Sequence, residues 1–70
     1  MIRTAETGVL TPRERGVMVE IVAGLNSREI GAHLGINPRT VDVYRAAAVQ
    51  KLGANNSAHA AVIFDRADRV

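Results

Sequence analysis

The chain has no cysteine among its 70 residues, so it can form neither a disulfide framework nor a thiolate metal site. Its two histidines, His33 and His59, lie far apart and have no partner at metal-ligand spacing. The glycines stand singly and form no phosphate-cradling loop, and the serines match no nucleophile motif. The sequence therefore predicts no metal, no cofactor and no enzyme activity.

Long apolar runs are also absent. Nowhere do about 18 apolar residues follow one another, and the first residues carry charges without a signal-peptide core, so we expect a cytoplasmic chain that does not contact a membrane. Apolar residues still make up 47% of the sequence, enough for one small core. The net charge is only +2, so any attraction to a polyanion must depend on where the basic residues lie.

The first helix signal follows a segment without periodicity. Residues 1–9 are predicted to be a flexible lead-in, and residues 10–70 to form one domain. Thr11, Pro12 and Glu14 form a capping box with proline at the first helical position. Helical spacing of apolar residues and a stop at Gly24 predict a helix over 12–24; its stripe consists of Val17, Met18, Ile21, Val22 and Leu25.

Two further helices are predicted to follow at close quarters. Asn26 and Glu29 repeat the capping signal, and the short helix that they start ends at Gly35. The turn from Gly35 to Asn37 is too short for an antiparallel return, and Ile36 is expected to insert beneath both helices. Pro38 then opens a helix over 38–52, since no glycine or proline interrupts it. The pattern is that of a helix-turn-helix.

A fourth helix is predicted after the polar break at residues 53–57, capped by Asn56 or Ser57. One face of it is expected to close the core and contains Ala60, Ile63, Phe64 and Ala67. A second face contains Ala58, Ala61, Val62 and Asp65. The fold class is therefore all-α, with four helices.

The helix over 38–52 has two distinct sides. At about 100° per residue, Val41, Ala48 and Leu52 share one meridian, which is predicted to pack on the first two helices. The opposite side is flanked by Asp42 and Ala47, is slim enough to enter a groove about 12 Å wide, and contains Arg39, Val43, Ala46 and Gln50. The helix N-terminus, with its amides and dipole, is expected to favour a phosphate near Asn37, Arg39 and Thr40.

The pattern resembles the LuxR-type helix-turn-helix domain of bacterial transcriptional regulators over roughly residues 10–67. The resemblance rests on Leu10-Thr11-Pro12-Arg13-Glu14-Arg15, Gly24-Leu25-Asn26-Ser27-Arg28-Glu29-Ile30, Leu34-Gly35-Ile36, Thr40-Val41 and Lys51-Leu52. It implies base contacts from the positions of Asp42, Val43 and Ala46, and sugar-phosphate contacts from those of Thr40, Tyr44 and Lys51. It also implies dimerisation through the last helix, at Ala58, Ala61, Val62 and Asp65.

The chemistry of each side chain indicates which of these contacts it can make. Val43 can touch a thymine methyl group and Gln50 can reach a base edge or a phosphate, whereas Ala46 has no hydrogen-bonding group. Asp42 can accept from cytosine or can compensate the helix dipole in the first turn. The phenol of Tyr44 is expected to donate to a phosphate, with simple packing as the alternative.

Three basic residues complete the predicted site. Lys51 is expected to be exposed and to contact a phosphate. Arg45 is expected to pair with Glu14 or Glu20, with a phosphate contact as the alternative. Arg28 can straddle a DNA backbone or be a surface charge, while Arg13 and Arg15 are interpreted as surface charges.

The chain departs from the family pattern at three places. Tyr44 replaces the usual histidine, and Asn55-Asn56-Ser57 stands where relatives carry an arginine, so one phosphate contact is missing. Gly16 replaces a usual glutamate in the first helix, at a cost of about 0.5–1 kcal/mol relative to alanine.

The sequence thus predicts a DNA-binding transcriptional regulator whose recognition helix enters the major groove of double-stranded DNA, as a homodimer on two related half-sites. One alternative is an adaptor that retains the fold and binds RNA polymerase or another regulator. Another is sigma-factor region 4, but Lys51-Leu52-Gly53 and the fourth helix favour the LuxR type.

Overall fold

The computed structural model describes residues 10–69, with side chains described as far as residue 67. Within these residues the chain forms helices and no strand, as the sequence predicts; they are α1 (Pro12–Val22), α2 (Ser27–Leu34), α3 (Pro38–Lys51) and α4 (Ser57–Arg69). Residues 1–9, predicted as a lead-in, lie outside the described part. None of the described helices combines the length and hydropathy that crossing a membrane requires.

Both predicted capping boxes are confirmed. The Thr11 hydroxyl accepts from the Glu14 amide at 3.2 Å, and the Glu14 carboxylate accepts from the Thr11 amide at 2.9 Å. The same exchange joins Asn26 and Glu29 at 2.9 Å in each direction. Since each box satisfies two amides that a helix start leaves without partners, these residues fix where α1 and α2 begin.

The helix ends differ slightly from the prediction. Helix α1 ends at Val22, two residues before the predicted end, and Gly24 lies outside it with φ of 96°. The Gly24 amide donates to Ile21 and the Leu25 amide to Glu20, so the chain leaves the helix in a tight turn that needs this positive φ. Val22, predicted as part of the apolar stripe, is 41% exposed.

Helix α4 is capped by Asn56, one of the two predicted candidates. The Asn56 carboxamide accepts from the His59 amide at 2.8 Å, and the His59 ring accepts from the Asn55 amide at 3.1 Å. The predicted core face is confirmed, because Ala60 and Phe64 are buried and Ile63 packs against the same cluster.

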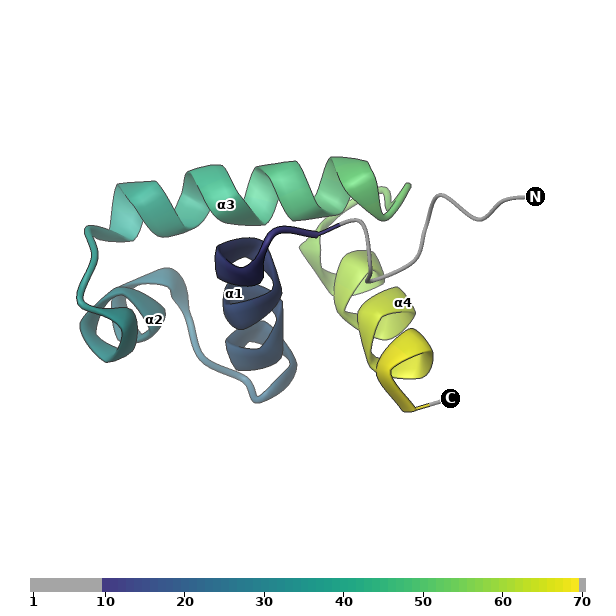
Figure 1. The fold of residues 1–70 in the computed structure, drawn as a ribbon, viewed down its shortest axis with the longest axis horizontal. Helices are drawn as coiled ribbons and strands as arrows, with labels where there is room; N and C mark the ends of the chain where they lie inside the picture. Colours follow the sequence, from purple (N-terminus) through teal and green to yellow (C-terminus); the bar gives the residue numbers. More distant parts are fainter. Residues whose placement is uncertain (1–9, 70) are drawn as a thin grey trace.

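The core consists of two clusters, which α3 connects. Val41, near the start of α3, packs with Val17 and Ile30. Ala48 and Leu52, at its other end, pack with residues of α1 and α4. Val41, Ala48 and the C-cap residue Leu52 are at most 1% exposed, so the predicted inner meridian is correct. Helix α3 runs along one side of the molecule, with α2, α1 and α4 beneath it (Figure 1), and its outer side remains uncovered by the other described helices.

The turn of the helix-turn-helix depends on a close approach that the sequence patterns do not reveal. Gly35 takes φ of 71°, and the Ile36 amide donates to the Gly31 carbonyl at 2.9 Å. Ile36 packs against the cluster of Val17, as expected. A Cβ atom at Gly31 would lie 2.7 Å from the Ile36 carbonyl oxygen and 3.3 Å from the Pro38 nitrogen. The turn therefore folds directly onto the bare backbone of α2.

Candidate nucleic-acid interface

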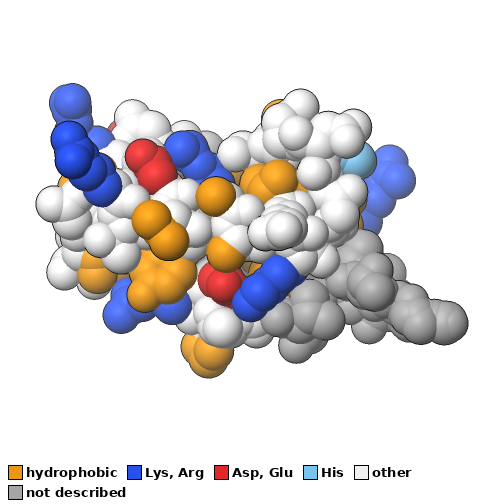
Figure 2. Space-filling model, turned by 90° about the horizontal axis from the view of Figure 1, so that it is seen from above, with side chains coloured by type: hydrophobic (Ala, Val, Ile, Leu, Met, Phe, Trp, Pro, Cys, Tyr) orange, Lys and Arg blue, Asp and Glu red, His pale blue; other side chains and the backbone are white. Residues whose placement is uncertain are grey.

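The outer side of α3 carries the slim exposed ridge that the sequence predicts. Arg39, Val43, Ala46 and Gln50 are all exposed, Val43 at 66%, while Ala47 beside them is half-buried. Figure 2 looks onto this side and shows hydrophobic side chains along the face, blue basic groups around them, and red acidic groups next to some of the blue ones. The ridge is therefore accessible, and its surroundings are not uniformly basic.

The N-terminus of α3 offers fewer amides than expected. The Asn37 carboxamide accepts from the Arg39 amide at 2.8 Å, and the Asn37 carbonyl accepts from the Thr40 amide at 2.9 Å. Pro38 has no amide hydrogen. The amides of Arg39 and Thr40 are therefore already bonded within the chain, and a phosphate near this helix end stays a prediction. The side chains of Asn37, Arg39 and Thr40 are still exposed on this end of the helix.

Asp42 joins α3 to the first turn of α2. One of its carboxylate oxygens accepts from the Ser27 hydroxyl at 2.5 Å and from the Arg45 guanidinium at 2.7 Å. Two charge-assisted bonds on one oxygen hold the carboxylate in place. The first turn of α3 contains no acidic residue, so the dipole-compensating role considered for Asp42 is wrong. Its carboxylate instead positions Arg45 and attaches α2 to one flank of α3.

The predicted partner of Arg45 is therefore wrong. Arg45 pairs with Asp42, one turn earlier on the same helix, and not with Glu14 or Glu20. The Glu20 carboxylate instead lies 2.6 Å from Nδ1 of the exposed His33, which links α1 to the last turn of α2. A helical wheel gives the direction of Arg45 but not the nearer competing carboxylate on its own helix.

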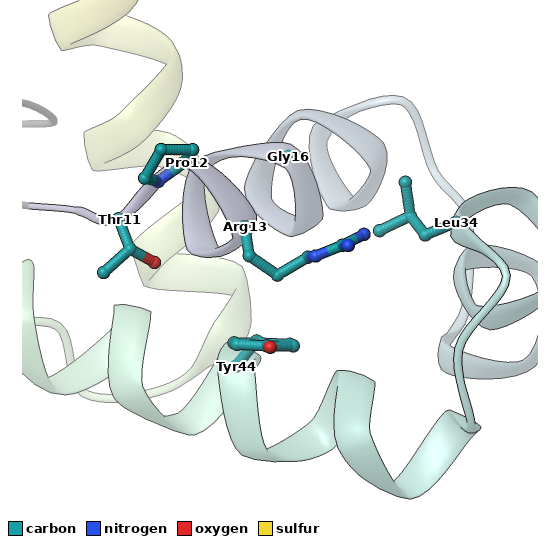
Figure 3. A pocket seen from close by; sticks show the side chains of 6 residues that line it. All are labelled: Thr11, Pro12, Arg13, Gly16, Leu34 and Tyr44. Carbon is teal, nitrogen blue, oxygen red and sulfur yellow. The ribbon is translucent and has the colours of Figure 1, made fainter.

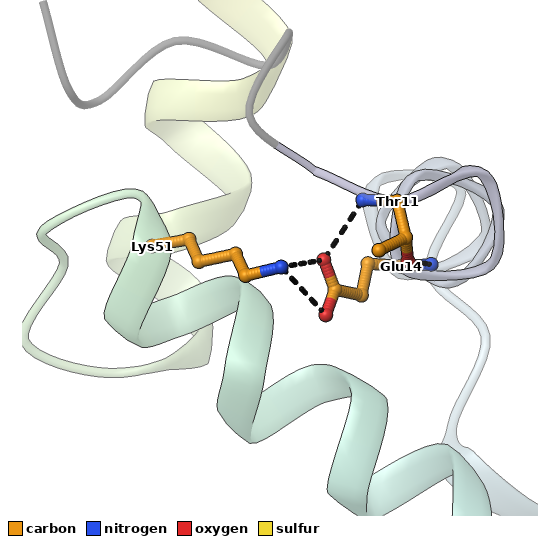
Figure 4. A network of polar contacts seen from close by, with 3 residues as sticks. All are labelled: Thr11, Glu14 and Lys51. Carbon is orange, nitrogen blue, oxygen red and sulfur yellow. Dashed lines mark hydrogen bonds and ion pairs between the residues drawn. The ribbon is translucent and has the colours of Figure 1, made fainter.

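On the opposite flank of α3, Lys51 contacts the buried carboxylate of Glu14, a residue of α1. Lys51 Nζ donates to both Glu14 oxygens, at 2.8 and 3.1 Å, and the Thr11 amide donates to the same carboxylate (Figure 4). The Glu14 side chain is only 8% exposed and that of Lys51 is 38% exposed. Burial by itself raises the pKa of Glu14, but the bonds from Lys51 and Thr11 outweigh it and hold the pKa below its ordinary value.

The ion pair with Glu14 limits how Lys51 can contact a phosphate. The side chain is exposed, as predicted, but its ammonium group is already bound by Glu14, so a phosphate must share or replace that carboxylate. The capping box indicated the local bonds of Glu14. Nothing in the sequence indicated its second partner, which lies 37 positions away.

Tyr44 lies at the edge of an open hollow of about 620 Å³ beside α3. The side chain is half-buried and packs against the cluster of Val17, so packing and an exposed phenol edge coexist. Figure 3 shows Arg13 extending from α1 across this hollow toward the end of α2. The residues that line it are Thr11, Pro12, Arg13, Gly16, Leu34 and Tyr44.

Three exposed arginines occupy equivalent positions in three helices. Arg13, Arg28 and Arg39 are each the second residue of their helix. Among the side chains of residues 10–67, no hydrogen bond or ion pair of these three is found, in contrast to Arg45 and Lys51. These three described cations, for which no carboxylate partner is found, therefore stand at the starts of α1, α2 and α3.

Comparison with known proteins gives the family of this arrangement. The family model described as bacterial regulatory proteins, luxR family, matches residues 8–64. The chain belongs to this family. The transcriptional regulatory protein FixJ of Bradyrhizobium diazoefficiens is 44% identical over 52 residues, which cover 74% of this chain and 25% of FixJ. The transcriptional regulatory protein UhpA of Escherichia coli is 47% identical over 47 residues, which cover 67% of this chain and 24% of UhpA.

A solved structure of the same family agrees with the fold. The crystal structure of full-length FixJ from B. japonicum superposes with a TM-score of 0.77 at 38% identity, over 90% of this chain and 31% of that one. The chain thus spans 24–31% of the length of these relatives.

The outer face of α4 in this luxR-family domain is partly occupied. Of the four residues predicted to form a dimer interface, Ala58 and Val62 are exposed, Val62 at 50%. Ala61 and Asp65 are half-buried, and Ala61 packs against the domain's own core. A second chain would therefore meet mainly the side that contains Ala58 and Val62.

Proposed function

We propose that this chain is the DNA-binding domain of a transcriptional regulator and that α3 enters the major groove of double-stranded DNA. One observation carries the proposal: the inner meridian of α3 is buried, while Arg39, Val43, Ala46 and Gln50 on its outer side are all exposed. An α-helix with one free, slim side fits the major groove, where base pairs present distinct hydrogen-bonding patterns. The similarity to FixJ and UhpA, which are transcriptional regulatory proteins, supports the same function.

The proposed roles follow from chemistry and position. Val43 contacts a thymine methyl group, and Gln50 reads a base edge or reaches a phosphate. Ala46 and Ala47 permit close approach without a hydrogen bond. Asp42, already bonded to Ser27 and Arg45, retains lone pairs for a cytosine amino group.

The remaining predicted residues meet the sugar-phosphate backbone. Arg39 and Arg28 do so with charges that no described carboxylate neutralises. Lys51 does so at the expense of its contact with Glu14. Asn37, Thr40 and Tyr44 contact the DNA backbone with uncharged groups that can donate or accept hydrogen bonds.

Binding as a function of salt concentration tests the proposal. Affinity for random duplex should fall as salt rises, with a logarithmic slope of about −0.9 for each phosphate neutralised. Arg39→Ala should weaken binding to all sequences and reduce the slope by about 0.9. Val43→Ala or Gln50→Ala should instead change the preferred sequence in a selection experiment.

Arg66→Ala is the matched control, because Arg66 is an exposed arginine near the far end of α4 and its loss changes the net charge equally. It should leave the slope unchanged. A wild-type slope near zero, or equal slopes for Arg39→Ala and wild type, contradicts the proposed surface.

The chain is further proposed to bind as a homodimer through the outer face of α4, where Ala58 and Val62 are exposed. A two-fold interface would align two copies of α3 on inverted half-sites and combine two weak contacts. On a duplex with two half-sites, size-exclusion chromatography with light scattering should give the mass of two chains. A mass of one chain per duplex at saturation rejects the dimer.

A second candidate, an adaptor that binds RNA polymerase or another regulator, is favoured by one observation. Two basic side chains of α3, Arg45 and Lys51, are neutralised by carboxylates of the chain itself. A surface of reduced positive charge suits a protein partner better than a phosphate backbone. Absence of salt-dependent duplex binding, together with binding to a purified polymerase, would establish this alternative.

A further inference from the structure

We infer that the hollow beside Tyr44 seats the sugar-phosphate backbone of one DNA strand and that Arg13 is the side chain that binds its phosphate. The inference rests on the proposed DNA binding by α3 and adds a residue that the sequence indicated only as a surface charge. It also gives a role to a surface outside the ridge of α3.

The hollow lies where a DNA strand beside α3 would pass. Its walls come from the first turns of α1, the last residue of α2 and Tyr44 of α3 (Figure 3), so it is continuous with the flank of α3. The two strands that border a major groove pass on opposite sides of an inserted helix. A strand on the Tyr44 side of α3 would pass over this hollow.

The arrangement of α1 and α2 around α3 supports the same conclusion. Asp42, which bonds to Ser27 at the start of α2, and Tyr44, which borders the start of α1, project about 160° apart around α3. The first turns of α1 and α2 therefore flank α3 on opposite sides. Arg28 follows Ser27 on one side, and Arg13 occupies the corresponding second helical position on the other.

The charges on the Tyr44 side of α3 also favour Arg13 as the phosphate-binding residue. On the Tyr44 flank, Lys51 is bound by Glu14, whereas Arg13 has no carboxylate partner among the described residues. A cation in the first turn of a helix is opposed by the helix dipole, so Arg13 does not stabilise α1 electrostatically. Its guanidinium is instead available for a bidentate contact with a phosphate.

The shape of the hollow depends on Gly16. A Cβ atom added there would find no other atom within 4 Å, so the glycine leaves the space open. The volume of about 620 Å³ is in the range of sites that hold a small molecule or a nucleotide-sized group. The apolar walls around Pro12, Leu34 and the Tyr44 ring suit the sugar, and the arginine at the edge suits the phosphate.

The electrostatic test uses the full chain and random duplex at several salt concentrations. Arg13→Ala should weaken binding about three- to tenfold at low salt for all sequences and reduce the logarithmic slope by about 0.9. Arg13→Lys should retain the slope, and Arg66→Ala should behave as wild type. A wild-type slope for Arg13→Ala, alongside a reduced slope for Arg39→Ala, overturns this inference but leaves the proposed function intact.

The steric test changes no charge. Gly16→Leu places a bulky side chain in part of the hollow and replaces glycine by a good helix former, so the fold should be retained, as thermal unfolding would check. Binding should weaken at least threefold compared with Gly16→Ala, which adds one methyl group only. Equal binding by Gly16→Leu and Gly16→Ala shows that no strand occupies the hollow and overturns the inference. Loss of duplex binding by wild type itself would instead reject the proposed function.

Discussion

Replacing Gly31 by alanine should destabilise the fold by about 2–3 kcal/mol, although alanine favours helices more than glycine does. The added methyl group would lie 2.7 Å from the Ile36 carbonyl oxygen and 3.3 Å from the Pro38 nitrogen. Both are backbone atoms of the turn between α2 and α3, so they cannot move aside as a side chain can. The midpoint of thermal unfolding should fall by about 8–20 °C, measured by circular dichroism.

Gly16→Ala is the matched control for this prediction. Gly16 also lies inside a helix, but an added Cβ there has open space around it. Without a clash, the change should stabilise the chain by about 0.5–1 kcal/mol because alanine loses less backbone entropy than glycine on folding. If Gly31→Ala lowers the free energy of unfolding and Gly16→Ala raises it, the effect of the close approach at Gly31 is distinguished from the effect of helix propensity. A stabilised Gly31→Ala variant would show that the turn does not pack on α2 as described.

Replacing Lys51 by alanine should cost about 1–2 kcal/mol of stability at neutral pH. The variant leaves the buried Glu14 carboxylate with the Thr11 amide and hydroxyl groups but without its cation. The expected loss of stability lies toward the lower end for a charged hydrogen bond, because the Lys51 side chain is 38% exposed and solvent screens its charge. Urea unfolding monitored by circular dichroism measures the loss, and Arg66→Ala should be close to neutral.

The pH dependence of the Lys51→Ala effect follows from Glu14. The pKa of Glu14 in the folded chain lies below its ordinary value of 4.5, because the bonds from Lys51 and Thr11 outweigh the effect of burial. A lowered folded-state pKa stabilises the fold above the unfolded-state pKa, and this stability is lost as the pH falls through the folded-state value. The difference between wild type and Lys51→Ala should therefore be constant near neutral pH and shrink below about pH 4.5. An unchanged difference at pH 3 would contradict the assigned contact.

The same contact links stability to the proposed DNA binding. A phosphate that approaches Lys51 must compete with a carboxylate held at 2.8 Å. Lys51→Ala thus removes both a structural contact and a proposed phosphate contact. Arg39→Ala tests the DNA surface more directly, since no carboxylate partner of Arg39 is found among the side chains described, those of residues 10–67.

The sequence by itself determined the features that depend on neighbours within about four residues. The capping boxes at Thr11 and Asn26, the positive φ of Gly35 and the buried meridian of α3 all follow from local hydrogen bonding and from helical periodicity. These signals were enough to predict four helices and the exposed ridge. The end of α1 was predicted less well: the helix ends at Val22, and Gly24 lies in the turn that follows it.

Tertiary structure alone decided which elements meet and which charges remain available. The requirement for glycine at position 31 arises where the turn crosses α2, and the pairing of Lys51 with Glu14 arises where α1 passes α3. The pairing of Arg45 with Asp42, three residues earlier on the same helix, is by contrast a local contact that helical periodicity allows. Helical periodicity gives the direction in which a side chain projects, whereas the angle and spacing between helices determine what it meets there.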